Sequence, residues 1–549
     1  MKRSHGCTAL VVCTCVLMFI SSPNAQDNLS PARIGVPQDW SQNQILFTRD
    51  GLMKNPGVVD SEPRVVFQAF QRWQTAGRPQ EATQASSAPG DPPHRDWNVS
   101  LNNGHVAANM FPAKYSFDAA APPSCANDYV VFGLSRAGAN KQANLVAFNN
   151  LYSGTPAGIC GAAPTTLFAY NISTIAAGRI LTSPVLSLDG TQIAFVESGN
   201  IAGTLTSVFH VLTWSSGPGN GTAPNQPAVP GVGNTATMTS LTLTTPATAA
   251  LDNHSSPWVD YKTHTAYVGT DDGHIYKIVN VFNGTPALAG GPWPLLISSG
   301  DFATSPVLDN RLGKLLVSSQ NGTLYKIDVS TGAITSLVIG KRGTILAPAL
   351  VDVVNGTAYV VSANDGTSGV LVQVNTNAMS QITKGRIGLA SRSGTAVSLS
   401  QPAVSNTYFT NPASAVIRTC GTGPNDITPY QYAFGFTGTT MNSNPVSSSQ
   451  LLTSTNARCT GFTEFFNPNI GAGGTDFFFF GLTQDCAGAG TSGCVVALNP
   501  GVSLTEAAVA GGPSGIVVDN YSTAAQASSI YFSGVGTNTA FKLTQNGLQ

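Results

Sequence analysis

Short apolar runs separated by turn residues recur along the chain, most clearly between positions 254 and 338. The runs are rich in β-branched and aromatic residues, which predicts β-strands. Asp272-Gly273 and Asn321-Gly322 lie between such runs and predict tight hairpins, because the central residues of that turn need a positive φ. One unit is therefore strand, turn, strand, glycine turn, strand, and a fourth run completes an antiparallel sheet. The runs of one unit are Val307–Asp309, Lys314–Ser318, Thr323–Asp328 and Ile334–Val338.

The unit repeats, and each copy begins at a comparable anchor residue. A single small sheet leaves both of its faces exposed, whereas radial packing of several sheets covers the faces and leaves only short edges. We therefore predict an all-β fold, a single β-propeller of about eight four-stranded blades. Seven blades is the alternative, because the sixth and seventh units are degenerate. The anchors are Pro112, Pro184, Pro257, Pro306, Pro348, Pro402, Phe462 and Pro513.

The last unit offers only three clear strands, at 515–519, 530–533 and 540–543. Asp96–Leu101 has the pattern of a strand before the first blade, and we expect it to complete the last blade and close the ring. A free N-terminal strand is the alternative. The predicted propeller spans 96–549, and residues 26–95 form an N-terminal extension, with a short helix at Val65–Trp73 and a flexible linker at 75–95.

Residues 1–25 have the pattern of a signal peptide. Lys2 and Arg3 precede an apolar stretch, Ala9 to Ile20, that is too short to span a bilayer, and small residues up to Ala25 offer a cleavage site. Lipid attachment at Cys13 is the alternative, but the apolar segment before it is too short. No later run approaches the length of a transmembrane helix. We expect a secreted or periplasmic monomer without a membrane span.

The cysteine count agrees with export. Nine cysteines occur and three precede residue 26, which leaves six. An even set in an exported chain predicts disulfides, most simply paired in sequence order. A redox or zinc site is disfavoured because no C-x-x-C spacing occurs. The six are Cys125, Cys160, Cys420, Cys459, Cys486 and Cys494.

Charge is scarce along the whole chain. Charged residues make up 10% and the formal net charge is −1. Without a basic stripe to neutralise phosphates, nucleic acids and anionic membrane surfaces are poor partners. The many Ser, Thr and Asn side chains offer neutral hydrogen bonds, which favours an uncharged partner, either a protein or a glycan.

The repeat resembles that of quinoprotein-like (PQQ-type) propellers, in the order S-P-x-x-D, Y-V-G, D-G, L-Y-x-I-D, T-G. The resemblance implies a propeller fold. In quinoprotein dehydrogenases many repeats continue as T-G-x-x-x-W, but here Ala-Ile-Thr-Ser follows Thr331-Gly332, and no adjacent cysteines follow residue 25. We therefore expect no cofactor, and a PQQ-dependent dehydrogenase is a minor alternative. The motif residues are Ser305, Pro306, Asp309, Gly322, Leu324, Tyr325, Ile327, Asp328, Thr331 and Gly332.

A second similarity covers most of the predicted propeller. The segments D-W-x-V-S-L, at Asp96–Leu101, and V-A-F-N-N-L-Y-S, at Val146–Ser153, are similar to segments of uncharacterised secreted propellers of soil bacteria. This similarity implies a fold more than an activity.

Three sets of residues could form metal, cation or glycosylation sites, but we favour a surface or turn role for each of them. His254, His264 and His274 fall on different predicted strands and turns, so we expect surface histidines rather than metal ligands. Recurring Asp residues at strand ends cap turns more often than they form a cation-binding ring. Asn-Gly-Thr is a glycosylation acceptor or simply a turn, and we favour the turn. The Asp set is Asp260, Asp309, Asp352 and Asp519, and the Asn-Gly-Thr set starts at Asn220, Asn283, Asn321 and Asn355.

We predict a binding or scaffold protein that holds a partner or glycan at the channel mouth. Turns between the second and third strands lie on that face, and loops from neighbouring blades meet them there, although Asn and Asp favour such turns anyway. The alternative is a propeller lyase or hydrolase that acts on polysaccharide with two carboxylates across the channel. No G-x-S-x-G motif occurs, and we assign no catalytic residue. The predicted binding residues are Asp271, Asp272, Asp301, Asn321, Lys341, Arg342, Asn364 and Asp365.

Overall fold

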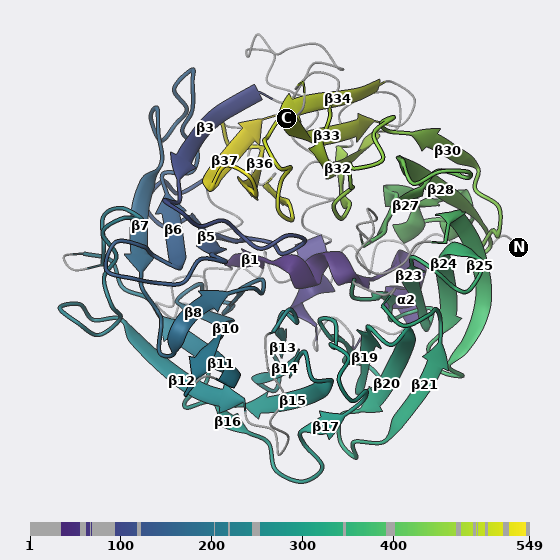
Figure 1. The fold of residues 1–549 in the computed structure, drawn as a ribbon, viewed down its shortest axis with the longest axis horizontal. Helices are drawn as coiled ribbons and strands as arrows, with labels where there is room; N and C mark the ends of the chain where they lie inside the picture. Colours follow the sequence, from purple (N-terminus) through teal and green to yellow (C-terminus); the bar gives the residue numbers. More distant parts are fainter. Residues whose placement is uncertain are drawn as a thin grey trace, which may run out of the picture.

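The computed structural model shows eight sheets arranged as blades around a central axis (Figure 1). The chain is a β-propeller, as the repeat predicts, and it has eight blades rather than seven. The structure describes residues 35–54, 57, 62–65, 67–68, 94–117, 122–202, 204–217, 220–243, 253–343, 347–390, 401–467, 474–486, 490, 492–499, 503–519 and 526–544. The predicted signal peptide and most of the predicted linker lie outside these residues.

Blade 4 shows how the repeat folds. Its strands are β18 (Val307–Asp309), β19 (Lys314–Ser319), β20 (Thr323–Asp328) and β21 (Ile334–Val338), paired in chain order from the axis outward. Gly322 in the hairpin between β19 and β20 has a φ of 90°, and an added Cβ would lie 2.2 Å from the carbonyl oxygen of Gly340. Glycine is therefore required at position 322, both for the positive φ and because the backbone of residue 340 packs against it.

The other blades follow the same plan with additional short strands. Blade 1 contains β4 (Ala113–Ser116), β5 (Tyr129–Gly133), β6 (Leu145–Asn149) and β7 (Thr165–Tyr170). Blade 2 contains β8 (Ala176–Ile180), β9 (Val185–Leu186), β10 (Gln192–Ile201), β11 (Thr204–Thr213) and β12 (Thr237–Leu243). Blade 3 contains β13 (Trp258–Asp260), β14 (Thr265–Gly269), β15 (His274–Val279), β16 (Ala287–Leu288) and β17 (Leu295–Leu296).

Blades 5 to 7 complete the second half of the ring. Blade 5 contains β22 (Leu350–Asp352), β23 (Thr357–Ser362), β24 (Ser368–Asn375) and β25 (Ser380–Leu389). Blade 6 contains β26 (Ala403–Val404), β27 (Val416–Thr422), β28 (Pro429–Thr437), β29 (Thr440–Met441) and β30 (Ser447–Gln450), with short helices η2 (Asn406–Phe409) and η3 (Pro412–Ser414). Blade 7 contains β31 (Thr463–Asn467), β32 (Thr475–Gln484), β33 (Ser492–Asn499) and β34 (Ser503–Ala508).

Blade 8 joins the two ends of the ring. It contains β35 (Val517–Asp519), β36 (Ser529–Gly534) and β37 (Thr539–Thr544), and β3 (His94–Ser100) pairs antiparallel with β37 as its outermost strand. Fully buried ion pairs lie where blade 8 meets blade 1: Lys542 contacts Asp96 at 3.2 Å, and Lys114 contacts Asp519 at 2.8 Å. Burial lowers the pKa of Lys542 to about 8, although the nearby Asp96 opposes this shift.

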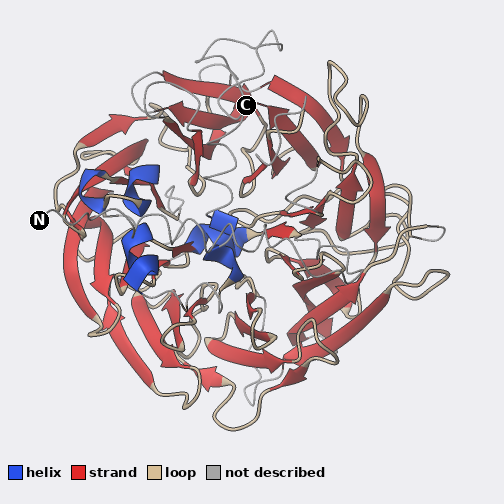
Figure 2. Cartoon of the chain, turned by 180° about the vertical axis from the view of Figure 1, so that it is seen from behind, coloured by secondary structure: helices blue, strands red, loops and turns tan. Residues whose placement is uncertain are grey.

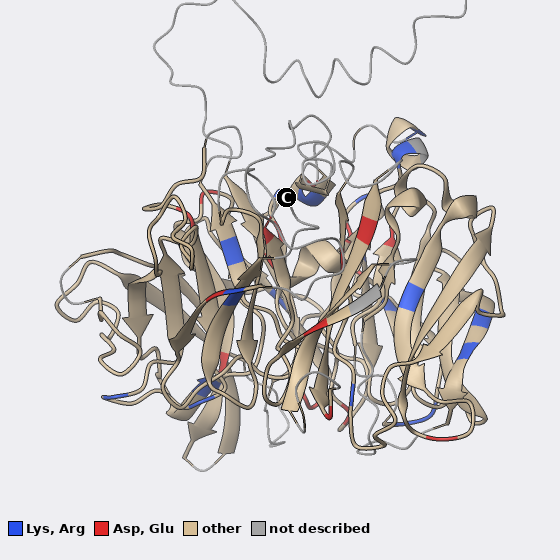
Figure 3. Ribbon diagram, turned by 90° about the horizontal axis from the view of Figure 1, so that it is seen from above, with Lys and Arg blue, Asp and Glu red and all other residues tan. Residues whose placement is uncertain are grey.

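Apolar side chains fill the interfaces between neighbouring blades. In β32, Phe478 and Phe480 pack in a cluster with residues of blade 6, while Phe477 and Phe479 pack with residues of blade 8. Successive side chains of a strand point to opposite faces, so a continuous apolar run supplies both interfaces at once. This two-sided burial explains why the repeat needs so few charged residues, which lie scattered over the ribbon in Figure 3.

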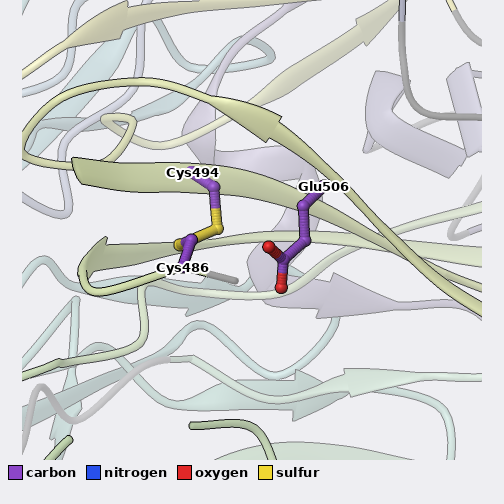
Figure 4. A group of neighbouring side chains, drawn as sticks. All are labelled: Cys486, Cys494 and Glu506. Carbon is purple, nitrogen blue, oxygen red and sulfur yellow. A yellow bond between two sulfur atoms is a disulfide. The ribbon is translucent and has the colours of Figure 1, made fainter. Parts of the chain in front are cut away.

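The six cysteines form three disulfides in the predicted order, Cys125–Cys160, Cys420–Cys459 and Cys486–Cys494. The Glu506 carboxylate lies close to the third bridge (Figure 4). Because both sulfurs there are bonded to each other, this group offers no thiolate to a metal ion. None of the helices among the described residues is both long enough and apolar enough to cross a membrane.

The N-terminal segment crosses the centre of the ring. Strand β1 (Val36–Gln38) pairs antiparallel with β4, the innermost strand of blade 1, and β2 (Ile45–Leu46) pairs parallel with β22, the innermost strand of blade 5. The short helix η1 (Trp40–Gln44) lies between them on the axis, and α2 (Arg49–Lys54) follows (Figures 1 and 2). We call the described residues 35–54, 57, 62–65 and 67–68 the crossing segment.

The sequence predicts an N-terminal extension but does not predict that it enters the ring. Strands of two or three residues carry too little pattern to be recognised in sequence, and their partners are supplied by the unpaired inner edges of distant blades. Of the helix expected at Val65–Trp73, residues 65, 67 and 68 are helical and the remaining positions lie outside the described residues.

Candidate functional site

A cavity of about 280 Å³ lies on the ring axis. Every blade contributes at least one lining residue from the segment that precedes its innermost strand, and Trp40 of the crossing segment also lines the cavity. Apolar surface comes from Met110, Phe111, Phe302 and Pro348. The volume is close to the lower limit of about 300 Å³ for small-molecule sites.

Trp40 is fixed in place by hydrogen bonding and by aromatic packing. Its indole N–H donates to the carbonyl oxygen of Pro257 at 3.1 Å, and its ring meets that of Trp258 edge to face at 5.9 Å. Trp40 is 2% exposed. The crossing segment therefore presents a rigid surface to the cavity.

Arg64 ties the crossing segment to blade 3. The fully buried guanidinium donates to Glu62 at 2.9 Å, to the Ser41 hydroxyl at 2.7 Å and to the carbonyl oxygen of Val259 at 3.1 Å, and it lies 4.1 Å from the ring centre of Trp258. Burial raises the pKa of Glu62, although the Arg64 charge opposes this shift. Such a pair holds its segment only while both partners are present.

The serines of the Ser-Pro anchors join one blade to the next. The hydroxyl of Ser183 accepts the backbone N–H of Phe111 at 2.9 Å, that of Ser256 accepts the N–H of Ser183 at 2.8 Å, and that of Ser305 accepts the N–H of Ser256 at 2.8 Å. These bonds run from blade 1 to blade 4 around the cavity wall. Blade 5 has Ala347 at the corresponding position.

Several hydrogen-bond donors at the cavity have no strong acceptor. The Ser183 and Ser256 hydroxyls approach the thioether sulfur of Met110 at 3.7 and 3.4 Å, and sulfur is a weak acceptor. The Gln401 side chain is 5% exposed; its Oε1 accepts from Gln44 at 2.5 Å, whereas its Nε2 has no partner among the described residues. A buried amide N–H without an acceptor costs about 1–3 kcal/mol, which a ligand oxygen would offset.

The structure places one of the predicted binding residues in the cavity wall. Asp271 lines the cavity and contacts His254 at 2.8 Å. The neighbouring Asp272 contacts His274 at 2.8 Å and accepts from the Thr270 hydroxyl, so it stabilises its own turn.

The other predicted residues lie in turns and loops on the same side of the blades, where they make local contacts. Asp301 pairs with Arg342 at 2.6 Å, and Asp365 pairs with Lys384 at 2.6 Å. Asn321 donates to Ser298 and Tyr325, and the backbone N–H of Lys341 donates to the carbonyl of Asn364. They lie on blades 3 to 5 and are not among the residues that line the cavity.

The three histidines do not share a partner, and three of the four recurring aspartates stabilise turns. His264 lies in a turn with a φ of 50°, while His254 and His274 pair with different aspartates. Asp260, Asp309 and Asp352 accept backbone N–H groups two or three residues ahead. Asp519 is the exception, because it pairs with Lys114 of blade 1.

Sequence reasoning missed Gln401, Trp40 and Met110 as cavity residues. None belongs to a motif, and they meet only because the ring closes. The Ser-Pro pairs recur regularly in the sequence, and this recurrence could have predicted a shared structural role for their serines.

Comparisons with known proteins assign no family to this chain. No protein-family model matches the chain, and no curated protein matches it in sequence. Similar solved structures include the Dos1 propeller, at 12% identity and a TM-score of 0.49, covering 82% of this chain and 95% of that one. Saccharomyces cerevisiae Sqt1 has 10% identity and a TM-score of 0.46, covering 82% and 100%. BamB from Moraxella catarrhalis has 12% identity and a TM-score of 0.39, covering 82% and 99%.

Proposed function

We propose that this propeller is a binding or scaffold protein whose axial cavity holds a neutral, oxygen-bearing group of a glycan or partner protein. Gln401 carries this proposal, because it lines a cavity that every blade helps to build and its Nε2 has no acceptor among the described residues. The Ser183 and Ser256 hydroxyls add donors whose only acceptor among the described side chains is a thioether.

The lining favours binding over hydrolysis of polysaccharide. Hydrolysis of a glycosidic bond needs two carboxyl groups about 5–10 Å apart on either side of the bond. Among the described residues that line the cavity, Asp271 is the one carboxylate, and it contacts His254. A neutral ligand also agrees with a chain that has 10% charged residues.

The remaining parts of the proposal extend from the sequence. Residues 1–25 act as a signal peptide, and the mature monomer works outside the cytoplasm, where its three disulfides are stable. The quinoprotein-like repeat serves as a scaffold without a quinone, because T-G-x-x-x-W is missing after Thr331-Gly332. Asp271 lies beside the bound group in the cavity wall. The other predicted mouth residues contact the part of the partner outside the cavity, and they are Asp272, Asp301, Asn321, Lys341, Arg342, Asn364 and Asp365.

A glycan array and a peptide-and-protein pull-down with the purified full-length protein test the proposal. For any partner found, Gln401→Met removes the amide while keeping an unbranched side chain, and we expect about 2–12-fold weaker binding from the loss of one hydrogen bond. Gln450→Met, on the exposed outer strand of the same blade, is the matched control and should bind as wild type. Failure to bind in both screens, or equal affinity of both variants, contradicts the proposal.

A further inference from the structure

Three side chains of blade 2 form a chain of hydrogen bonds far from the axial cavity. Ser240 lies on β12, His210 on β11 and Glu197 on β10. The Ser240 hydroxyl lies 2.9 Å from His210 Nδ1, and Glu197 Oε2 lies 2.9 Å from His210 Nε2. Nucleophile, base and orienting carboxylate are thus in hydrogen-bond contact in the order used for acyl transfer.

The register of the sheet produces this arrangement. Ser240 and His210 are directly opposite cross-strand partners. His210 is opposite Phe195, and Glu197 follows two residues later on the same face of β10. Because a cross-strand partner lies near the Cβ atom, Ser240 meets Nδ1, the ring nitrogen closer to the backbone. Nδ1 therefore has the position of the base, and Nε2 faces the carboxylate.

The Glu197 carboxylate fixes the histidine tautomer. Its oxygens also accept the backbone N–H groups of Thr174 and Ile175 and the Thr174 hydroxyl. Because the carboxylate accepts hydrogen bonds, the ring proton belongs on Nε2, which leaves Nδ1 free to accept the proton of Ser240. Both His210 and Glu197 have fully buried side chains, so their geometry is held rigidly.

Ser240 itself is exposed, whereas its two partners are buried. It lies on the outermost strand of its sheet, and among the described residues no strand pairs with the outer side of β12. Such an edge has outward-pointing N–H groups that the sheet does not use, and these are suitable donors to an oxyanion. The neighbouring strand residues Thr239 and Leu241 are neutral, which suits an uncharged ester.

We propose that Ser240, His210 and Glu197 form a second, catalytic site that hydrolyses small neutral esters. Ser240 Oγ attacks the carbonyl carbon while its proton moves to His210 Nδ1, and Glu197 stabilises the imidazolium. The carbon–oxygen bond to the alcohol then breaks, and the alcohol leaves with that proton. Water attacks the acyl-serine in the same way, which releases the acid and restores Ser240. This proposal is independent of the axial cavity.

Reaction with a fluorophosphonate probe tests the site in the intact, full-length protein. The probe forms a bond from phosphorus to Ser240 Oγ and releases fluoride, and the serine proton moves to His210. Peptide mapping by mass spectrometry should locate the label at Ser240. Ser336 is the internal control, because it is also exposed on an outermost strand but lies opposite Tyr325 instead of a histidine.

We expect Ser240 to be labelled at least about 100-fold faster than Ser336, since general base catalysis contributes about 10²–10⁴-fold. Ser240→Ala should abolish both the label and hydrolysis of p-nitrophenyl acetate, and Thr242→Ala, on the same strand face, should retain both. His210→Gln should lower the labelling rate by a similar factor. If that variant does not fold, urea-denatured wild type takes its place in the test. In the denatured protein, Ser240 should no longer be labelled faster than Ser336. Equal labelling of Ser240 and Ser336 in the folded protein would overturn the proposal.

Discussion

Replacing Arg64 with methionine should loosen the crossing segment. Methionine keeps much of the apolar stem but removes a guanidinium that donates to Glu62, Ser41 and Val259 and lies over the Trp258 ring. Glu62 would keep the Asn310 side chain and the backbone N–H of residue 64 as donors, but it would lose its buried cation. Removing one partner of a buried pair costs about 3–5 kcal/mol.

The size of this loss should depend on pH. Burial already raises the pKa of Glu62, and removing the opposing Arg64 charge raises it further. A carboxyl whose pKa is higher in the folded state favours folding below its ordinary pKa, and this contribution is lost as the pH rises. The destabilisation of Arg64→Met should therefore be largest near pH 8 and shrink toward pH 5.

Urea unfolding followed by tryptophan fluorescence measures the effect, because Trp40 and Trp258 are buried in edge-to-face contact. The double variant Glu62→Gln/Arg64→Met should recover most of the loss, since no charge is then left unpaired. Arg136→Met, at an exposed position, should change the free energy of unfolding by no more than about 0.5 kcal/mol. If Arg64→Met were as stable as this control, or the double variant less stable than the single one, the reasoning would be refuted.

Two further predictions concern the aspartates and the serines of the repeat. Burial raises the pKa of Asp309 to about 6, so the folded state binds the proton more tightly and the free energy of unfolding falls as the pH rises from about 4 to 6. In urea titrations over this range, wild type should lose up to about 3 kcal/mol relative to Asp309→Asn. Parallel pH profiles of the two proteins would contradict this prediction. Ser256→Ala removes the acceptor of the buried Ser183 N–H and should cost about 1–3 kcal/mol. Ser336→Ala, on an exposed outer strand, should cost almost nothing, and equal melting temperatures for both variants would argue against the inter-blade bonds.

The repeat made most of the ring predictable from sequence. Each anchor, from Pro112 to Pro513, comes shortly before the innermost strand of a blade, because the chain must return to the axis at that point in every repeat. The hairpin glycines and the strand-end aspartates also have the conformations that their residue types favour. Local preference and the global fold agree at these positions.

The sites were less predictable because they depend on contacts between distant parts of the chain. Gln401 and Trp40 are neighbours of one cavity only after the crossing segment enters the ring. Ser240, His210 and Glu197 come together through strand register, which no spacing in the sequence reveals. The mouth residues were chosen from turns, and the structure shows most of them engaged in local bonds.

Hydrogen exchange of the crossing segment in the full-length protein tests the central claim, that this segment is fixed across the ring and lines part of the cavity. The account predicts slow exchange for the backbone N–H groups of β1 and β2 that pair with β4 and β22, comparable to other inner strands of the ring. It also predicts that Arg64→Met speeds exchange there while leaving blade 4 unchanged. Exchange across Val36–Leu46 at the rate of an unstructured peptide would contradict the account.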